Sequence, residues 1–547
     1  MTARVFGELP AATMLSDTPY GLRKTFLFIL MVALWIGAGL IGRDPWSPQE
    51  TGFVIFIAEK NGIITGLPES ARPEMPASAY PTWAAVSAAA FSSWLPAHEG
   101  ARMLNAILLA LTLAFIWSAA GGGRRGWMAV LLTFGMTGLM VRAHLLNLAV
   151  PAFFGAAMLL QGASLLRTHA LLGGIILGMS AAFLLATASP GVAPFALVGA
   201  AAVLLRSEWR RPRVFAGLLV AAVFFAPLAF LTLSAEHFTT LSPNNDWTRV
   251  SDFLRLAAWA LFPTLPIAVT VLGHGRIDST MFLCITMTAA AAVHFMLFGG
   301  REEDLFWLMP ALAVFTARGL ERLPDNYASI LDWFAVIIVG VGCVGGMWVG
   351  WVLWQTGAGN DWTAIWRERF PLLGFPSEAA VGWKVMLALT VTVLWAGMAA
   401  NFGRSNERAI LNWSCGIAAA WCVFNLLWMP VVDSGKSYRG MAADVMIETD
   451  GGCMDASAAA GGAAAQLYYF GVNAGDSSCL WRLQAKSESP PEDFKSVWEG
   501  GRYDRKNYVL YRRKTETDYS AAVFNKDGGQ SGNATKTALI EFGLARH

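Results

Sequence analysis

Six charged residues stand where the sequence turns from apolar to polar, and their types suit the chemistry of a phosphorylated lipid. A guanidinium holds a phosphate through two parallel hydrogen bonds, and a carboxylate can orient an acceptor or remove its proton. The sequence therefore predicts three carboxylates as catalytic residues and three arginines as ligands of a lipid phosphate. The carboxylates are Glu50, Asp44 and Glu74, and the arginines are Arg301, Arg142 and Arg43.

Each of these residues also has a simpler explanation. Glu50 ends a Ser-Pro-Gln-Glu run that is typical of a helix start, with proline in the first turn and an acid near the positive end of the helix dipole. Arginines at helix ends often only extend their charged heads into the lipid headgroups. Arg142 and Arg301 are the stronger candidates, because arginine is disfavoured on outer links. His144 could bind phosphate or a metal, although a single histidine at a helix end more often only forms hydrogen bonds.

Other catalytic classes find no support in the sequence. No spacing of His, Cys, Asp or Glu resembles a zinc site, no glycine-rich turn follows a strand, and no Gly-x-Ser-x-Gly elbow occurs. ATP-driven and catalytic-triad chemistry are therefore not expected, and neither a cofactor nor a metal is predicted. The net charge of +2, without a dense basic patch, gives no reason to expect a nucleic-acid partner.

The composition is that of a protein with many membrane-spanning helices. Of 547 residues, 55% are hydrophobic and 14% are charged, whereas soluble domains carry about a quarter charged residues. Taking about 17 to 25 apolar residues as one span, the sequence contains roughly thirteen. They centre near 25–41, 101–120, 126–142, 147–164, 171–187, 191–205, 214–234, 253–273, 279–298, 305–318, 330–354, 382–401 and 409–430.

Basic residues are concentrated in alternate loops between these spans. Arg23 and Lys24 precede the first span, which we interpret as a signal anchor rather than a cleaved signal peptide. Arg124 and Arg125, and the arginines between 206 and 213, lie in later loops of the same set. These loops should be cytoplasmic. An odd number of spans then leaves the N-terminus inside and the C-terminal region outside, on the same side as the candidate site.

The expected fold is an all-α polytopic membrane protein with a small C-terminal α/β domain. Residues 1–432 form the transmembrane part, including an outer loop over 43–100 in which 48–62 and 80–95 have the spacing of helices lying in the membrane interface. Residues 433–514 indicate an α/β domain, with a helix over 437–448 and a strand over 507–513. Residues 515–547 form a polar tail that is predicted to be disordered.

Two of the six cysteines are predicted to form a disulfide. Cys453 and Cys479 lie in the polar C-terminal region, which faces an oxidising compartment if the orientation above holds. The other four lie in apolar spans, where a thiol behaves as a small hydrophobic group. The alternative is that Cys453 and Cys479 are both free and buried.

The order of motifs resembles that of bacterial GT-C glycosyltransferases, in particular the aminoarabinose lipid A transferases within the protein O-mannosyltransferase superfamily. After the first span, residues 46–51 read Trp-Ser-Pro-Gln-Glu-Thr where the family has Trp-x-Pro-Asp-Glu-Thr, and 74–76 read Glu-Met-Pro where it has Glu-Lys-Pro. The segment 178–191 is similar to the family's glycine-rich fifth helix. Arg301 precedes the run Leu-Phe-Trp-Leu-Met-Pro. This order resembles that of the family, in which a basic residue precedes the start of an aromatic-rich helix.

The resemblance implies an enzyme of the bacterial inner membrane that moves a sugar from a polyprenyl-phosphate donor to a lipid or protein acceptor on the periplasmic face. Lipid A is one candidate acceptor, and the enzyme would act as a monomer. Gln49 stands where the family has Asp, and an amide cannot act as a base. The base is then Glu50, Asp44 or Glu74, or none is needed because a phosphate acceptor is already ionised.

Two other classes of protein remain open. A non-catalytic relative could keep the fold as a binding or assembly protein, which the Gln49 replacement favours. A lipid or sugar transporter would need broken helices with polar groups at mid-membrane. The predicted spans are mostly apolar through their centres, which argues against the transporter.

Overall fold

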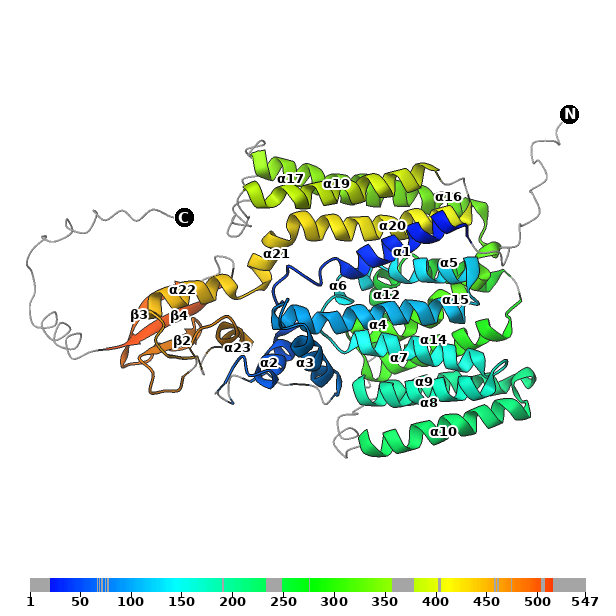
Figure 1. The fold of residues 1–547 in the computed structure, drawn as a ribbon, viewed down its shortest axis with the longest axis horizontal. Coiled ribbons are helices and arrows are strands. Elements are labelled where there is room, and N and C mark those ends of the chain that lie inside the picture. The colour runs from blue at the N-terminus through cyan, green and yellow to red at the C-terminus, as the bar shows by residue number, and fades with distance from the viewer. Residues whose placement is uncertain are drawn as a thin grey trace, which may run out of the picture.

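The protein is a bundle of roughly parallel helices with a small sheet-containing domain at one end (Figure 1). The structure, a computed structural model, describes residues 20–65, 67, 69, 72–73, 75, 78–188, 191–232, 248–274, 276–356, 378–401, 405–456, 459, 462–473, 475–502 and 507–514. Glu74 and the predicted tail over 515–547 therefore lie outside the described residues.

The first half of the chain supplies one side of the bundle. Its helices are α1 (Leu22–Gly37), α2 (Thr51–Lys60), α3 (Tyr80–Ala90), α4 (Ala97–Ala119), α5 (Gly123–Phe134), α6 (Leu139–Arg142), α7 (Ala149–Leu165), α8 (Ala170–Thr187), α9 (Val192–Ala201), η2 (Ala202–Leu205), η3 (Ser207–Trp209) and α10 (Pro212–Thr232). Helices α2 and α3 confirm the two helices expected in the outer loop. They lie at the end of the bundle that faces the small domain (Figure 1).

The second half completes the bundle. Its helices are α12 (Thr248–Ala260), α13 (Thr264–Gly273), α14 (Ser279–Phe298), η4 (Glu302–Leu308), α15 (Met309–Gly319), η5 (Leu320–Arg322), α16 (Asp325–Phe334), η6 (Ala335–Gly345), α17 (Gly346–Thr356), α19 (Glu378–Asn401), α20 (Asn406–Val423), η7 (Phe424–Trp428) and α21 (Met429–Lys436). Helices η6 and η7 are π-helical. Helix α21 leads from the bundle into the small domain (Figure 1).

Six helices in the described part of the chain are long and apolar enough to cross a membrane, and a bent pair would make a seventh. Four shorter apolar helices accompany them, so the polytopic fold is confirmed while the count of thirteen stays a prediction. The span expected over 253–273 is two helices bent by 102°. Pro263 explains the break, because it lies between them at the N-cap of α13 and cannot donate a helical hydrogen bond.

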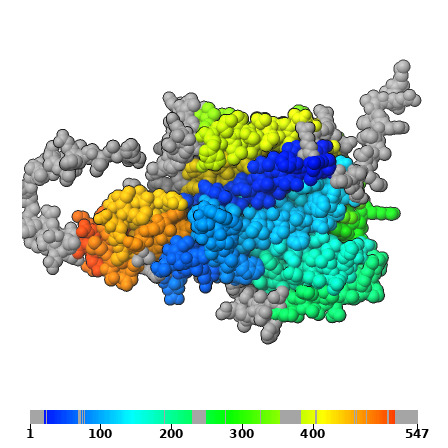
Figure 2. All heavy atoms as spheres, viewed as in Figure 1, coloured from blue at the N-terminus to red at the C-terminus, as the bar shows by residue number. Residues whose placement is uncertain are grey.

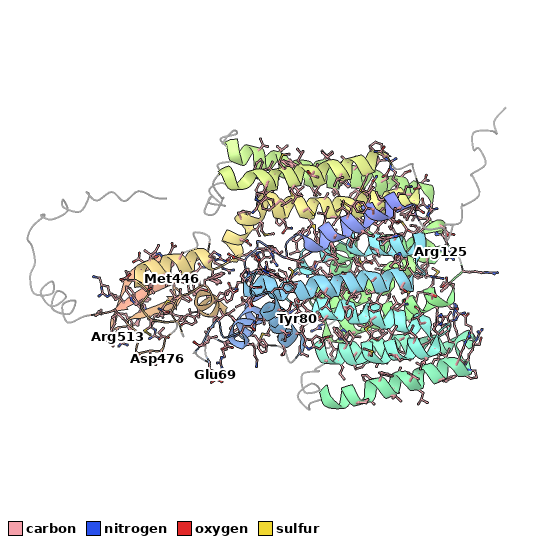
Figure 3. The ribbon with its side chains drawn as sticks, viewed as in Figure 1. Glu69, Tyr80, Arg125, Met446, Asp476 and Arg513 are labelled. Carbon is pink, nitrogen blue, oxygen red and sulfur yellow. A yellow bond between two sulfur atoms is a disulfide. The ribbon has the colours of Figure 1, made fainter. Side chains whose placement is uncertain are left out.

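The arginine-rich loops gather at the end of the bundle opposite the small domain. Arg124 pairs with Glu407 at 2.5 Å, and Arg318 pairs with Asp278 at 2.9 Å, so loops that are far apart in sequence meet there. Figure 3 shows Arg125 at this end and Tyr80 at the other. The prediction that these loops share one side of the protein is confirmed, and their assignment to the cytoplasm stays a prediction.

The C-terminal domain is a four-stranded sheet covered by helices. Its elements are α22 (Arg439–Thr449), β1 (Met454–Asp455), α23 (Gly462–Tyr469), β2 (Trp481–Ala485), β3 (Phe494–Gly500) and β4 (Tyr508–Arg513). The strand order is β1-β2-β4-β3, with β1 parallel to β2 and the other pairs antiparallel. Helix α22 and strand β4 confirm the helix and strand expected near 437–448 and 507–513.

The core of this domain extends into the outer loop. Leu483 and Leu510 face each other across β2 and β4 and are both fully buried. Ile55 and Ala58 of α2 belong to the same apolar cluster. Figure 2 shows that the segment containing α2 and the C-terminal domain are in contact at the surface. Burial of α2 against the domain therefore links the membrane part to the domain through apolar contacts.

The predicted disulfide between Cys453 and Cys479 is confirmed, with 5.5 Å between the two Cα atoms. It joins the start of β1 to the turn before β2 and closes a loop with a sequence separation of 26 residues. Closing a loop of this length restricts the unfolded chain and typically stabilises the fold by about 2–4 kcal/mol.

We expect the double variant Cys453→Ser/Cys479→Ser to be cleaved faster by protease in the C-terminal domain of the intact protein, because about 2–4 kcal/mol of stability is lost. Limited proteolysis of the protein in nanodiscs measures this directly. Cys343→Ser, which removes an exposed free thiol, is the control. Equal cleavage rates for the double variant and the control would contradict the assigned role of the disulfide.

Candidate functional site at the outer loop

The loop after α1 begins with a turn that requires glycine. Gly39 has a φ of +82°, and a side chain there would collide with Trp421 and Asn425. The carbonyl of Gly39 accepts a hydrogen bond of 3.0 Å from Nε of Arg43. The turn therefore directs Arg43 back into the protein instead of toward the membrane surface.

Glu50 is the centre of a buried ionic cluster. Its carboxylate accepts hydrogen bonds from Nε and Nη2 of Arg102 at 2.9 and 2.8 Å and from Nη1 of Arg43 at 3.2 Å. The amides of Trp46 and Leu146 each donate to it at 3.0 Å. Glu50 and Arg102 are 0% exposed, and Arg43 is 2% exposed. Burial alone would raise the pKa of Glu50, but Arg102 and Arg43 outweigh it and lower this pKa to about 2.

The same arginines shape the backbone of the loop. Arg102 donates to the carbonyls of Arg43 and Asp44 at 2.7 and 3.0 Å, and Arg43 donates to the carbonyl of His144 at 3.0 Å. Five donors on a planar guanidinium allow one side chain to hold a carboxylate and two carbonyls together. The loop conformation therefore depends on the two arginines that neutralise Glu50.

A hydroxyl and an amide support the cluster from α3 and α4. The Tyr80 hydroxyl donates to Oδ1 of Asn105 at 2.6 Å, and Nδ2 of Asn105 donates to the carbonyl of Leu145 at 2.8 Å. Because Leu145 precedes the residue whose amide binds Glu50, this chain fixes that amide in place. All of these groups are buried, and buried polar networks are rigid when every member has a partner.

Asp44 faces the C-terminal domain. Its carboxylate accepts from Nη2 of Arg439 at 2.5 Å, from Nε of Arg439 at 2.9 and 3.0 Å, and from the hydroxyl of Ser437 at 2.9 Å. Burial opposes ionisation, but the hydrogen bonds from Arg439 and Ser437 keep the pKa of Asp44 below its usual range. Asp44 is thus an ionised group held by the first residue of α22.

A second aspartate, Asp433 on α21, reaches the same loop. Its Oδ1 accepts from the indole of Trp46 at 2.8 Å, and its Oδ2 accepts from the amide of Asp44 at 3.2 Å. Burial raises the pKa of Asp433 to about 6; the Trp46 hydrogen bond opposes this rise and the neighbouring Asp44 carboxylate adds to it. This carboxylate therefore titrates much closer to neutral pH than Glu50 does.

Further contacts join the loop and α4 to the C-terminal domain. Nε2 of Gln466 donates to the hydroxyl of Thr51 at 2.8 Å, and the ring of His98 forms a 2.7 Å hydrogen bond with the hydroxyl of Tyr469. Arg502 contacts the carbonyl of Ser47 at 3.4 Å. The candidate site is thus shared between the membrane part and the domain.

A cavity of about 220 Å³ opens beside the loop. Its lining includes Gln49, Thr51, Phe53 and Met75 from the loop region and Gly462 from α23. The side-chain oxygen of Gln49 is buried without a hydrogen-bond partner. A volume below the roughly 300–1,000 Å³ of drug-sized ligand sites suits a small polar group or a single ring.

Arg142 and Arg301 lie in a second charged group, around the start of η4. Arg142 pairs with Glu303 at 2.9 Å and with Glu302 at 3.4 Å. Arg301 is exposed, and its amide donates to Oδ2 of Asp304 at 2.9 Å. The Arg142 side chain and the Arg301 backbone therefore contact one acidic cluster, residues 302–304.

The structure brings together some of the predicted residues and separates others. Arg43, Asp44 and Glu50 lie in one cluster, whereas Arg142 and Arg301 form the other. Both ring nitrogens of His144 face backbone carbonyls, of Met140 at 3.0 Å and of Trp35 at 2.8 Å. This geometry matches the hydrogen-bonding role and leaves the ring no position for phosphate or metal. No group of three metal-ligating side chains occurs within the described ranges.

The sequence analysis missed the residues that reach the loop from the end of the chain. Asp433, Ser437 and Arg439 contact Asp44, from which they are separated by about 390 residues in sequence. The only available signal was that polar residues follow directly after the last apolar span. Such residues have many possible roles, and their partner could not be inferred without the fold.

Comparison with known proteins establishes the fold. No protein-family model and no curated protein matches the sequence. The crystal structure of ArnT from Cupriavidus metallidurans bound to undecaprenyl phosphate is similar over 91% of this chain and 99% of that one, with a TM-score of 0.60 and 14% identity. ArnT is an aminoarabinose lipid A transferase of the GT-C class. The chain has the fold of ArnT.

The apo state of the same ArnT gives a consistent result. The TM-score is 0.59 with 14% identity, and the match covers 89% of this chain and 98% of that one. The GT-C resemblance predicted from the motif order is therefore confirmed at the level of the fold. The match extends over nearly the whole chain, so it includes both the bundle and the C-terminal domain.

We expect Glu50→Gln to destabilise the protein by about 3–5 kcal/mol, because it leaves two buried arginines without a counter-charge. Thermal unfolding in detergent measures the loss. Glu59→Gln, which breaks the more exposed pair with Arg72, should cost about 0–1 kcal/mol. Equal unfolding temperatures for the two variants would contradict the central role of Glu50.

The contribution of Glu50 also has a defined pH dependence. Its folded pKa of about 2 lies below the ordinary glutamate value of 4.5, so its stabilising effect is fully present above that ordinary value. The effect is lost as the pH falls toward about 2. Between pH 5 and 8, the difference in stability between the wild type and Glu50→Gln should therefore stay constant.

Proposed function

We propose that this protein is an inner-membrane glycosyltransferase that moves a sugar from a polyprenyl-phosphate donor to a lipid or protein acceptor on the periplasmic face. In this orientation the N-terminus is cytoplasmic, and the outer loop and the C-terminal domain face the periplasm. The observation that carries the proposal is the GT-C fold over nearly the full chain, shared with a transferase bound to undecaprenyl phosphate.

The position of the charged clusters supports this function. The loop that contains Asp44 and Glu50 lies at the end of the bundle next to the C-terminal domain, opposite the arginine-rich loops (Figure 1). A lipid-linked donor has its chain in the bilayer and its phosphate at the membrane surface, where such a loop can meet it. Nucleotide sugars do not cross the membrane, so a transferase that works on the outer side needs a lipid donor.

For the donor phosphate we propose Arg301, with Arg142 beside it. Arg301 is exposed, and Arg142 is held near it by Glu302 and Glu303. A charge-assisted bidentate contact would stabilise the phosphate as it leaves the sugar. Arg43 was predicted for the same task, but its guanidinium is buried against Glu50. We propose that Arg43 acts on the donor only indirectly, by fixing the loop.

For the acceptor side, the geometry favours a positioning role for Glu50. Its oxygens already accept bonds from two arginines and two amides, and a pKa of about 2 makes it a weak base. Asp44 is accessible but bound by Arg439. We propose that Glu50 and Asp44 shape the acceptor site. Glu74, from the same loop, stays a predicted catalytic residue.

The cavity beside Gln49 is a suitable place for the sugar. It is bounded by the loop on one side and by Gly462 of the C-terminal domain on the other, and the unpartnered Gln49 oxygen can accept a bond from a hydroxyl. The domain would thus close the sugar site.

A non-catalytic binding protein with the same fold is the second candidate. The amide at Gln49 and the fully engaged Glu50 favour it, because both positions of the family's acid pair then lack a free base. Such a protein would bind the lipid carrier and leave the glycans of the cell unchanged.

We expect the purified protein in nanodiscs to bind undecaprenyl phosphate, and Arg301→Ala to weaken this binding about tenfold or more, since a hydrogen bond to a charged group contributes about 1.5–3 kcal/mol. Native mass spectrometry measures the bound fraction. Arg512→Ala, an exposed arginine on β4, is the matched control.

Binding that is equally strong for the wild type and for Arg301→Ala would remove Arg301 from the phosphate site. Failure of the wild type to bind undecaprenyl phosphate would contradict the proposed function itself.

A further inference from the structure

Three carboxylates meet where the loop, the last membrane helix and the C-terminal domain join. They are Glu50, Asp44 and Asp433, and they differ in what neutralises them. Glu50 pairs with Arg43 and Arg102, and Asp44 pairs with Arg439. Asp433 has no ion pair among those identified in the described part of the chain.

The hydrogen bonds of Asp433 come from neutral donors. The Trp46 indole and the Asp44 amide each donate to a different oxygen of this carboxylate. Each oxygen has a further lone pair, because an ionised carboxylate can accept about four bonds. Asp433 is held in position by the loop and still has the capacity to accept a proton.

Asp433 lies where the membrane bundle joins the C-terminal domain. Asp433 lies on α21, the short helix between the end of the last membrane helix and α22 of the C-terminal domain (Figure 1). It is half-buried, whereas Glu50 is 0% exposed. A lipid donor would arrive from the bundle and an acceptor from the outer side, and Asp433 stands at the boundary.

We propose that Asp433 is the base that takes the proton from a hydroxyl acceptor, the task that Gln49 cannot perform. This inference rests on the proposed function. In the step, the acceptor O–H bond breaks and its proton moves to a carboxylate oxygen of Asp433. The acceptor oxygen bonds to the anomeric carbon of the sugar, and the bond from that carbon to the phosphate oxygen breaks. Polyprenyl phosphate leaves with the electron pair, and Asp433 returns its proton to solvent.

The electrostatics agree with this role. The pKa of Asp433 is raised to about 6, mainly by burial, so the group is ionised at pH 7 and more basic than an ordinary carboxylate. The charged groups that act on it are Asp44 and Arg43 from the loop, Arg102 from α4 and Arg439 from α22. Together with burial, these groups place the pKa of the Asp433 carboxylate near neutral pH.

The test compares Asp433→Asn with two other variants in a strain that lacks the chromosomal gene. Asp444→Asn makes the same chemical change at an exposed site on α22. Trp46→Phe removes the indole donor but keeps an aromatic ring over Arg43, so it tests whether Asp433 only anchors Trp46. The readouts are undecaprenyl phosphate binding and the rate at which the missing glycan reappears in isolated membranes with their native donor and acceptor.

We expect Asp433→Asn to bind undecaprenyl phosphate as the wild type does while its rate falls about 10²- to 10⁴-fold, the usual contribution of a general base. Asp444→Asn should keep the wild-type rate, and Trp46→Phe should lose less than about tenfold. The wild-type rate should decrease as the pH is lowered through about 6, the pKa of Asp433, because the base becomes protonated. The rate of Asp433→Asn should not show this pH dependence.

Two results would overturn the assignment of Asp433 and leave the proposed function intact. One is an Asp433→Asn rate above a tenth of wild type, and the other is a rate loss in Trp46→Phe equal to that in Asp433→Asn. If the wild-type protein neither binds undecaprenyl phosphate nor restores any glycan, the proposed function fails and the assignment of Asp433 fails with it.

Discussion

The buried carboxylate of Glu50 determines the shape of the outer loop. Two arginines and two backbone amides converge on it, and the same arginines hold four backbone carbonyls. A buried charge of this kind is tolerated only when its partners are in place, because an unpaired charge in the interior costs several kcal/mol. The arrangement of Asp44, Trp46 and the start of α2 follows from this constraint.

The C-terminal domain is part of the site. It packs on α2 through an apolar core, binds Asp44 through Arg439, and adds Gly462 to the wall of the cavity. Segments from both ends of the sequence therefore meet at this end of the bundle. Asp433 lies at the junction between α21 and the loop.

Local features of the fold could be predicted from the sequence, because they depend on nearby residues. Helices α2, α3 and α22, strand β4 and the Cys453–Cys479 disulfide follow from periodicity and composition. The break at Pro263 was missed because a hydropathy average ignores bending. The motif order pointed to the loop, but periodicity could not show that Glu50 is enclosed by Arg43 and Arg102. Asp433 was missed because its contact with Asp44 crosses most of the chain.

We propose that the outer loop and the nearby arginines form a lipid-phosphate site at the end of the bundle next to the C-terminal domain. An experimental structure of the protein in nanodiscs with undecaprenyl phosphate tests it most directly. We expect phosphate density at this end, within bonding distance of Arg301 or Arg142. Phosphate density among the arginines near 206–213 at the opposite end, or none at the outer end, would contradict it.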